Sequence, residues 1–339
     1  MPARRTRSLD TRLLQAAASD DCATAVRLLA AGELVAVPTE TVYGLAADAR
    51  QPQAVLKIFA AKDRPRSHPL IVHLDSADRL AQWAAHIPPA AHALAQAFWP
   101  GPLTLLLHKA PWVDSTVTGG LDTIALRVPD HPVLLRVITS LGSGIAAPSA
   151  NPHKRLSPTS AAQVMSGLSG RIAAVLDGGP CKVGLESTIV DLTGDTVRIL
   201  RSGPITREQL QDVLGQPVEL PARHDVSVPG NMQVHYQPHA PLHLLSRAQL
   251  LGYIETHPQE QLAALFHGAA PASLAAGVRL HHQSLPLEKE GYARELYQRL
   301  HALDSLQPGR ILLESPPHEE AWLDVHDRLS RAATPLPTP

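Results

Sequence analysis

Residues 37–45 read Val-Pro-Thr-Glu-Thr-Val-Tyr-Gly-Leu, and residues 57–65 read Lys-Ile-Phe-Ala-Ala-Lys-Asp-Arg-Pro. The first stretch ends an apolar run with a proline and presents two threonines, a carboxylate and a tyrosine before a turn-forming glycine. The second indicates a helix that delivers Lys62 and Arg64 just before Pro65 stops it. Small hydroxyl groups beside a pair of cations are typical of a pocket for an anionic ligand. A strand, a polar turn and a solvated basic helix end would give the same residues.

Apolar runs alternate with helical segments over about the first two hundred residues. We expect strands at 34–37, 70–74, 103–107, 123–128, 145–147, 173–176, 188–192 and 197–200. Helical spacing is found at 9–31, 52–61, 76–85, 89–97, 131–140, 159–166 and 206–214. The alternation predicts an α/β fold, and the closely spaced last two strands favour some antiparallel pairing. The expected architecture is a twisted, mixed, open sheet with flanking helices.

The regular pattern stops between Gly215 and Pro241. Six prolines occur from Pro204 to Pro241. Prolines at this spacing interrupt helices, so the segment after Gly215 is expected to be an extended linker. Beyond it, strands are expected at 242–245, 261–266, 277–280 and 310–313, and helices at 246–256, 287–303 and 318–331. These predict a smaller C-terminal α/β, Rossmann-like domain. The expected divisions are a flexible tail (1–14), a large domain (15–214), a linker (215–241), a small domain (242–332) and a disordered tail (333–339).

Composition excludes several classes of protein. Lys and Arg number 30 against 31 Asp and Glu, and aromatic residues make up 4%, so stable direct binding of nucleic acid is not expected. The two cysteines, Cys22 and Cys181, form neither a zinc motif nor a disulfide framework, and they suit a reducing compartment such as the cytoplasm. No apolar run reaches the length of a membrane span, and no hydrophobic segment follows Arg4-Arg5 to make an export signal.

The sequence contains no glycine-rich motif suited to binding a nucleotide, so any nucleotide would have to be bound by other residues. Residues 142–147 satisfy G-x-G-x-x-A, but they open an apolar strand rather than a helix, and no Walker A motif exists. The loop at Ala147-Pro148-Ser149-Ala150-Asn151 leaves a strand, where open α/β sheets bind ligands. Ser149, Asn151 and Ser157 are therefore candidates, although a capping turn before the helix at 159 would explain the same residues.

Further segments follow the opening stretches in a fixed order. They are Pro69–His73, Trp99–Thr104, Gly120–Pro129, Ala147–Asn151 and Gly184–Ile189. Together these segments resemble the YrdC-type threonylcarbamoyl-AMP synthase family, in its longer, two-domain form. The resemblance covers residues 15–240 strongly and the remainder weakly.

The resemblance implies an enzyme that condenses L-threonine, bicarbonate and ATP into threonylcarbamoyl-AMP and releases pyrophosphate. It implies Mg²⁺ on the triphosphate, with ligands unknown, and a product passed to the tRNA threonylcarbamoyl-transfer machinery. No covalent protein intermediate is needed, so positioning and charge neutralisation carry the chemistry. By motif match, L-threonine is held by Thr41, His73, Arg127, Ala147 and Ser187. ATP is held by Lys62, Arg64, His68, Thr123, Ser149, Asn151, Ser157 and Arg201.

The linker also matches the family, through Pro229-Gly230 and a His-Tyr-x-Pro stretch at 235–238. The resemblance and the polar-aromatic composition predict a lid over the occupied site, with candidates Asn231, Gln233, His235 and Tyr236. A passive tether is the alternative. Two positions depart from the family pattern: Gln233 stands where an aromatic residue is common, and His68 stands where a small polar residue or lysine is usual.

Two other functions compete with the synthase. A hydrogenase-maturation carbamoyltransferase contains a similar domain that makes carbamoyl-adenylate, but it carries zinc fingers and this chain has only two cysteines. A non-enzymatic RNA-binding module of the same fold is the alternative from a different class. Near-neutral charge and few aromatic residues count against it. The sequence does not identify a general base.

Overall fold

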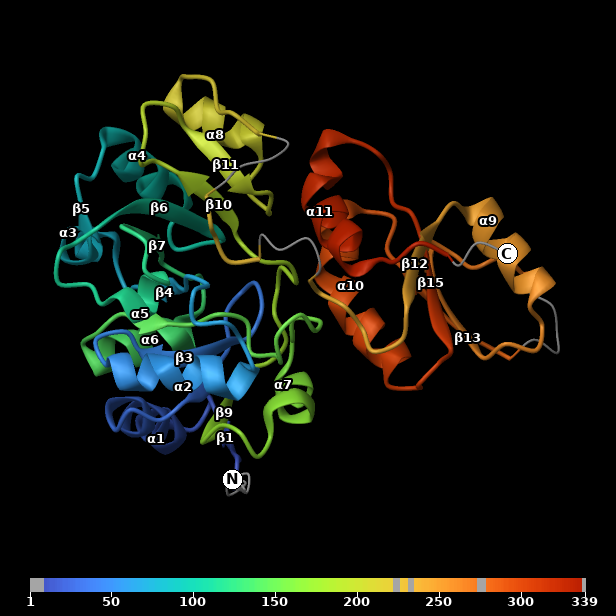
Figure 1. The fold of residues 1–339 in the computed structure, drawn as a ribbon, viewed down its shortest axis with the longest axis horizontal. Helices are drawn as coiled ribbons and strands as arrows, with labels where there is room; N and C mark the ends of the chain where they lie inside the picture. Colours follow the sequence, from blue (N-terminus) through green and yellow to red (C-terminus); the bar gives the residue numbers. More distant parts are fainter. Residues whose placement is uncertain (1–8, 222–225, 231–234, 273–278, 337–339) are drawn as a thin grey trace, which may run out of the picture.

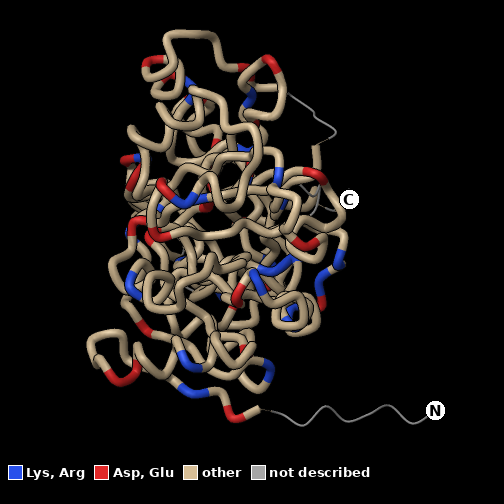
Figure 2. The backbone as a smooth tube through the Cα atoms, turned by 90° about the vertical axis from the view of Figure 1, so that its left-hand side faces the viewer, with Lys and Arg blue, Asp and Glu red and all other residues tan. Residues whose placement is uncertain are grey.

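The computed structural model describes residues 9–221, 226–230, 235–272 and 279–336. Two α/β units lie side by side, a larger one that runs to helix α8 and a smaller one that begins at strand β12 (Figure 1). Basic and acidic positions are interspersed over the side of the molecule in Figure 2. Among the described residues, no helix has both the length and the hydropathy to cross a membrane.

The large unit is built on one mixed sheet, as expected. Its strands are β1 (Arg12–Gln15), β2 (Val35–Val37), β3 (Gly44–Asp48), β4 (Ile71–His73), β5 (Ala84–Ala85), β6 (Leu103–Lys109), β7 (Thr123–Arg127), β8 (Ile145–Ala146), β9 (Ala174–Asp177), β10 (Thr188–Asp191) and β11 (Arg198–Arg201). They are ordered β1-β9-β2-β3-β8-β4-β7-β6-β10-β11, with β5 paired to β6. The last two strands are antiparallel, as their short connection favoured. Strand β2 is buried throughout, which an apolar run without alternation predicts, whereas the equally buried β3 was not expected, because Gly44 was interpreted as part of a turn.

Helices cover the sheet where the apolar periodicity placed them. They are α1 (Ser19–Ala30), α2 (Pro52–Lys62), η1 (Ala77–Arg79), α3 (Leu80–Trp83), α4 (Pro89–Phe98), α5 (Ser115–Thr118), α6 (Pro132–Leu141), α7 (Ala161–Leu168) and α8 (Arg207–Leu214). Helix α2 carries Pro52 in its first turn and ends at Asp63, whose backbone is left-handed (φ 54°). This ending turns the chain sharply and fixes the segment that carries Lys62 and Arg64.

The N-terminal segment differs from the prediction. Helical spacing suggested a helix from residue 9, and the flexible tail was expected to reach residue 14. Instead, β1 pairs in parallel with β9, and the Leu14 side chain is buried. The Thr11 hydroxyl donates to the carbonyl of Ile172 at 2.7 Å. Tertiary pairing outweighs local spacing here, so the helix begins only at Ser19. Residues 1–8 lie outside the described part of the chain.

The small unit has a parallel four-stranded sheet in the order β12-β15-β13-β14. Its elements are β12 (Leu242–Leu245), α9 (Arg247–Thr256), β13 (Leu262–His267), β14 (Leu280–Leu285), α10 (Lys289–Asp304), β15 (Arg310–Glu314), η2 (Glu320–Trp322) and α11 (Leu323–Ala332). The strand expected at 277–280 begins only at Leu280 and extends to Leu285. Residues 277 and 278 are not among those described.

Helices α10 and α11 lie on the side of the small sheet that faces the large unit (Figure 1). The backbones of the two units come close together at Gly184, which has φ +89° and would place a Cβ 2.5 Å from the Cα of Arg294 in α10. Both the backbone conformation and the space require glycine there. The two units are therefore docked tightly at the segment that leads into strand β10.

Candidate active site

A cavity of about 50 Å³ lies where the strands β4, β7 and β8 end. Strand register explains the convergence, because His73 of β4 is paired with both Arg127 of β7 and Ile145 of β8. All five residues predicted for L-threonine line this cavity, together with three predicted for ATP and two of the lid candidates. They are Thr41, His73, Arg127, Ala147 and Ser187; Arg64, Ser149 and Arg201; and His235 and Tyr236.

Arg127 is held by a carboxylate that the sequence analysis did not assign. Its Nη2 forms an ion pair with Oε1 of Glu40 at 2.6 Å, and its Nε donates to the carbonyl of Gly101 at 3.1 Å. Both side chains are buried. Nη1 makes no hydrogen bond with any described residue. A buried, pre-oriented guanidinium with one free edge is suited to binding a ligand carboxylate. Glu40 belongs to the sequence stretch 37–45, but nothing in that stretch indicates that Glu40 pairs with Arg127.

His73 is a neutral group in this site. Burial first, and the charge of Arg127 second, lower its pKa to about 3. Its Nδ1 is buried and has no hydrogen-bond partner among the described residues. An unpaired buried nitrogen costs free energy unless a ligand or water meets it. His73 therefore offers the cavity a hydrogen-bonding nitrogen without adding charge.

Arg201 joins strand β10 to the linker. Its Nε donates to the carbonyl of Ser187 at 3.0 Å, its Nη2 to the Ser187 hydroxyl at 3.0 Å, and its Nη1 to the carbonyl of Pro229 at 2.9 Å. The Ser187 hydroxyl also contacts the Thr104 hydroxyl at 2.8 Å. These contacts fix the serine that faces the cavity and place a cation beside it.

The cation pair at the end of α2 is buried, which contradicts the picture of a solvated basic helix end. Lys62 is 1% exposed and donates to the carbonyls of Ser149 and Asn151. Burial and the neighbouring Arg64 lower the pKa of Lys62 well below its ordinary value. Arg64 is 9% exposed, and its Nη2 donates to the carbonyl of Pro69 at 3.0 Å. Its Nε is buried without a partner, which leaves a donor for an anionic ligand.

Five of the residues predicted for ATP do not line the cavity: Lys62, His68, Thr123, Asn151 and Ser157. Asn151 donates to the carbonyls of Pro152 and Arg155, and Ser157 donates to Glu186 at 2.6 Å. Thr123 starts β7, whereas Arg127 ends it, so about 13 Å of extended chain separates their Cα atoms. Thr123 therefore lies at the far end of the strand from the cavity. Lys62 does not line the cavity itself, but it donates hydrogen bonds to the backbone carbonyls of Ser149 and Asn151 in the 149–151 loop.

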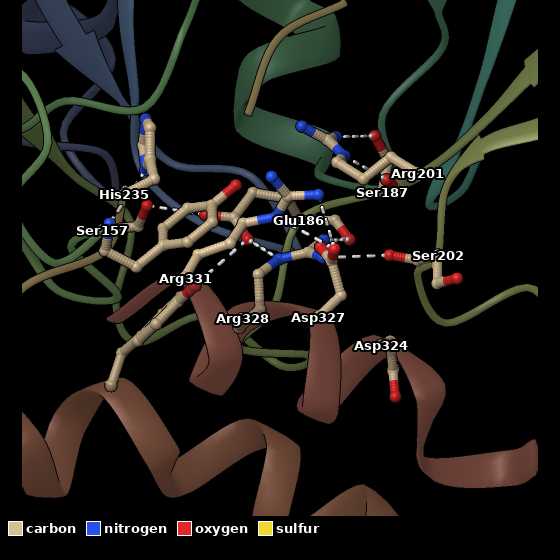
Figure 3. Close-up of polar contacts among 12 residues, drawn as sticks. Ser157, Glu186, Ser187, Arg201, Ser202, His235, Asp324, Asp327, Arg328 and Arg331 are labelled. Atoms are coloured by element: carbon tan, nitrogen blue, oxygen red, sulfur yellow. Dashed lines mark hydrogen bonds and ion pairs between the residues drawn. The ribbon is translucent and has the colours of Figure 1, made fainter. Parts of the chain in front are cut away.

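A buried ion pair connects the two units behind the cavity (Figure 3). Glu186 accepts from Nε of Arg328 in α11 at 2.7 Å and from the Tyr297 hydroxyl in α10 at 3.3 Å. Arg328 also donates to the carbonyl of Ser202 at 3.0 Å. Burial alone would raise the pKa of Glu186, but Arg328 and Arg201 outweigh it and hold the pKa below its ordinary value. Sequence analysis missed this pair because its members are 142 residues apart.

The linker closes one side of the cavity. Tyr236 is buried, stacks on Tyr297 at 5.9 Å between ring centroids, and lies 5.5 Å from the guanidinium of Arg328. Its backbone is left-handed (φ 61°). Gly230 (φ +80°) is so close to the Tyr236 hydroxyl that a Cβ would collide with it. Of the lid candidates, His235 and Tyr236 reach the cavity, whereas Asn231 and Gln233 lie outside the described residues.

Comparison with known proteins assigns this architecture. A family model described as "Telomere recombination" matches residues 27–203, and one described as "Threonylcarbamoyl-AMP synthase, C-terminal domain" matches residues 205–334. The chain belongs to the threonylcarbamoyl-AMP synthase family. A threonylcarbamoyl-AMP synthase of Bacillus subtilis is 38% identical over 92% of each chain, and one of Pyrococcus abyssi is 39% identical, covering 89% of this chain and 91% of the relative.

Solved structures of the threonylcarbamoyl-AMP synthase family agree with this fold. The P. abyssi Sua5 complexed with L-threonine superposes with a TM-score of 0.87 at 33% identity, covering 95% of this chain and 97% of that chain. A variant of the same protein, with a histidine and the following tyrosine replaced by alanine, gives a TM-score of 0.86 at 33% identity over 95% and 96%. The synthase resemblance and the predicted α/β architecture are thus confirmed.

Proposed function

We propose that this protein condenses L-threonine, bicarbonate and ATP into threonylcarbamoyl-AMP and releases pyrophosphate. The observation that carries the proposal is the cavity in which the free edge of Arg127 lies among small hydroxyl groups and buried cations. The family relatives are named as synthases, and one solved relative holds L-threonine. These names favour an enzyme over the RNA-binding alternative.

L-threonine would be bound by residues at or near the ends of the strands. The Nη1 edge of Arg127 would bind the carboxylate, because its Nε and Nη2 are already committed to Gly101 and Glu40. Thr41 and Ser187 offer hydroxyl groups to the amino acid, and His73 offers a neutral nitrogen. A site with this many polar groups should recognise the hydroxyl group of threonine as well as its carboxylate and amine.

The nucleotide half would use the buried cations. The threonine amine and bicarbonate form a carbamate with loss of water. A carbamate oxygen then attacks the α-phosphorus, so that a new phosphorus–oxygen bond forms as the bond from the α-phosphorus to the pyrophosphate oxygen breaks. Charge develops on the phosphate oxygens, where Arg64 and Arg201 line the cavity and Lys62 lies behind the 149–151 loop. Their side chains are fixed by carbonyl contacts, so little reorganisation is needed as the reaction proceeds. The labile product would pass to the tRNA threonylcarbamoyl-transfer machinery.

Mg²⁺ would accompany the triphosphate. Within the described ranges, no group of three or more histidine, cysteine, aspartate or glutamate side chains is arranged to hold a metal ion. The cavity's own carboxylate, Glu186, is already paired with Arg328. This donor set fits an ion held mainly by phosphate oxygens and water, which is how Mg²⁺ commonly binds with nucleotides. The ion would add charge neutralisation at the phosphates.

Substrate selectivity tests the proposed function directly. Pyrophosphate release should require threonine, and valine should support less than about one-hundredth of the rate because an apolar isostere leaves buried polar groups unpaired. Serine, which lacks only a methyl group, should lose about 10- to 200-fold in kcat/KM. The measurement is pyrophosphate release with ATP, bicarbonate and each amino acid. Equal turnover of valine and threonine would exclude this pocket, and salt-sensitive retention of tRNA without pyrophosphate release would favour the RNA-binding alternative.

The second proposal is that the linker acts as a lid. His235-Tyr236 is the one His-Tyr pair in the sequence, and Tyr236 contacts both the cavity and Arg328. Because the lid must open to admit ligands, limited proteolysis should cut between residues 216 and 241 readily in the free protein. Threonine plus ATP should slow that cleavage several-fold, whereas cleavage elsewhere should change little. Unchanged cleavage with both ligands present would leave a passive tether.

A further inference from the structure

Three histidine rings form a row beside the buried cations. The ring of His153 lies 5.5 Å from that of His68 and 6.1 Å from that of His235, measured between centroids. The three residues come from the segment after α2, the loop after β8 and the linker, so the fold brings them together. His235 lines the cavity, and the ring of His153 packs edge-on against that of His235 without itself lining the cavity. We call these three residues the histidine row.

His153 has unmet hydrogen-bonding capacity. Both of its ring nitrogens are buried and have no hydrogen-bond partner among the described residues. Its backbone is fixed, because the His153 amide donates to the carbonyl of Lys62 at 2.8 Å. The next residue, Lys154, is left-handed (φ 68°), and its carbonyl accepts from the Gln237 amide at 2.8 Å. Strained backbone that holds an unsatisfied imidazole in place is the kind of feature that functional sites retain.

The groups around His153 make the site attractive to an anion. Lys62, Arg64 and His68 face it from α2 and the segment after it, Lys154 from its own loop, and His235 from the linker. No described carboxylate is among them. Burial first, and then mainly the charge of Arg64, lower the pKa of His153 to about 4, and burial with Arg64 also lowers the pKa values of His68 and His235. The row is therefore uncharged near neutral pH without a ligand.

We propose that His153 is a further polyphosphate ligand, whose imidazole takes up a proton and donates hydrogen bonds to the terminal phosphates of ATP or to the released pyrophosphate. The inference rests on the proposed function, and it adds a residue that the motif match did not assign. A polyanion favours the charged imidazole, whereas the empty site disfavours it. Binding therefore takes up a proton between the pKa values of the free and the bound states, and affinity falls as pH rises through the bound-state value.

Calorimetry with the full-length protein measures this proton directly. MgATP is titrated at pH 6.0 in two buffers of different ionisation enthalpy, so that the buffer dependence gives the number of protons taken up. The variants are His153→Gln, which keeps a hydrogen-bonding group but does not titrate there, and His282→Gln, an exposed control on β14. Wild type and the control should take up more protons than His153→Gln. The His153 variant should bind about tenfold more weakly, the value of one charged hydrogen bond.

The outcomes separate this inference from the proposed function. Equal proton uptake and equal affinity for wild type and His153→Gln would overturn the inference while leaving ATP binding intact. Inorganic pyrophosphate serves as a second probe under the same conditions. If pyrophosphate binds with proton uptake that depends on His153 but MgATP does not bind, the polyphosphate-binding role of His153 stands and the proposed use of ATP is rejected. If neither pyrophosphate nor MgATP binds, both proposals are rejected. If His153→Gln loses its cooperative thermal transition, His153→Asn takes its place, and the same reduction in proton uptake is expected.

Discussion

Replacing Arg127 with methionine should raise the KM for threonine about a hundredfold, because the ligand carboxylate loses two charge-assisted hydrogen bonds. The same change should lower the free energy of unfolding by about 3–5 kcal/mol, since Glu40 becomes a buried carboxylate without its counter-charge. Steady-state pyrophosphate release and chemical denaturation measure the two effects separately. Methionine approximates the size of the arginine stem, so lost packing contributes little.

A double variant, Arg127→Met with Glu40→Gln, distinguishes binding from folding. It removes both charges of the buried pair, so most of the lost stability should return. Threonine use should stay impaired, because the guanidinium that would bind the carboxylate is still absent. Recovery of threonine use in the double variant would contradict the role given to Arg127.

Replacing Arg328 with methionine should also lower the free energy of unfolding by about 3–5 kcal/mol, because Glu186 remains buried between the two units without its partner. Pyrophosphate release should fall with it, since Arg328 also supports Tyr236 in the lid. The control is Arg299→Met on α10, which removes an exposed pair with Glu295 and should cost about 0.5 kcal/mol or less. Equal denaturation midpoints for the two variants would show that the interdomain pair adds no stability.

Acid should narrow the difference between wild type and Arg328→Met. The folded state holds the pKa of Glu186 below its ordinary value of about 4.5, so the stability from this pairing is present above that pH. It is lost as pH falls through the folded-state pKa. In Arg328→Met, Glu186 is buried without its counter-charge, which favours its protonated form. Acidification therefore removes the free-energy cost of burying a charged Glu186 in the variant. Denaturation curves from pH 7 to pH 3 should show the two proteins converging, and a constant difference would contradict this account.

Motif match, and not periodicity, selected the five residues proposed for L-threonine, and the strands explain why these residues converge on one cavity. Thr41, His73 and Arg127 follow or end strands that are buried on both faces, and parallel strand ends meet at one edge of a sheet. The sheet order then brings together segments that are far apart in the chain.

Pairings between distant segments were not predictable from local pattern. Nothing near Glu186 indicates that Arg328 is its partner, and nothing near Leu14 indicates a strand paired with β9. Burial of polar groups was misjudged for the same reason. Arg64 reads as a solvated residue at a helix end, but it is buried in the cavity lining and donates to the carbonyl of Pro69. A single sequence shows which residues are polar, and only the packed fold shows which ones lose their water.

Glu186 and Ser187 are consecutive, yet one pairs with the second unit and the other faces the L-threonine end of the cavity. If a shift of this one segment changes both contacts together, ligand binding and docking of the two units share a coupling free energy. Thermodynamics then requires reciprocity. Whatever factor the docked small unit adds to the affinity for threonine, bound threonine must add the same factor to the docking equilibrium. Because no described residue of the small unit lines the cavity, any effect of that unit on threonine affinity would have to pass through residues that do line it, such as those of this segment.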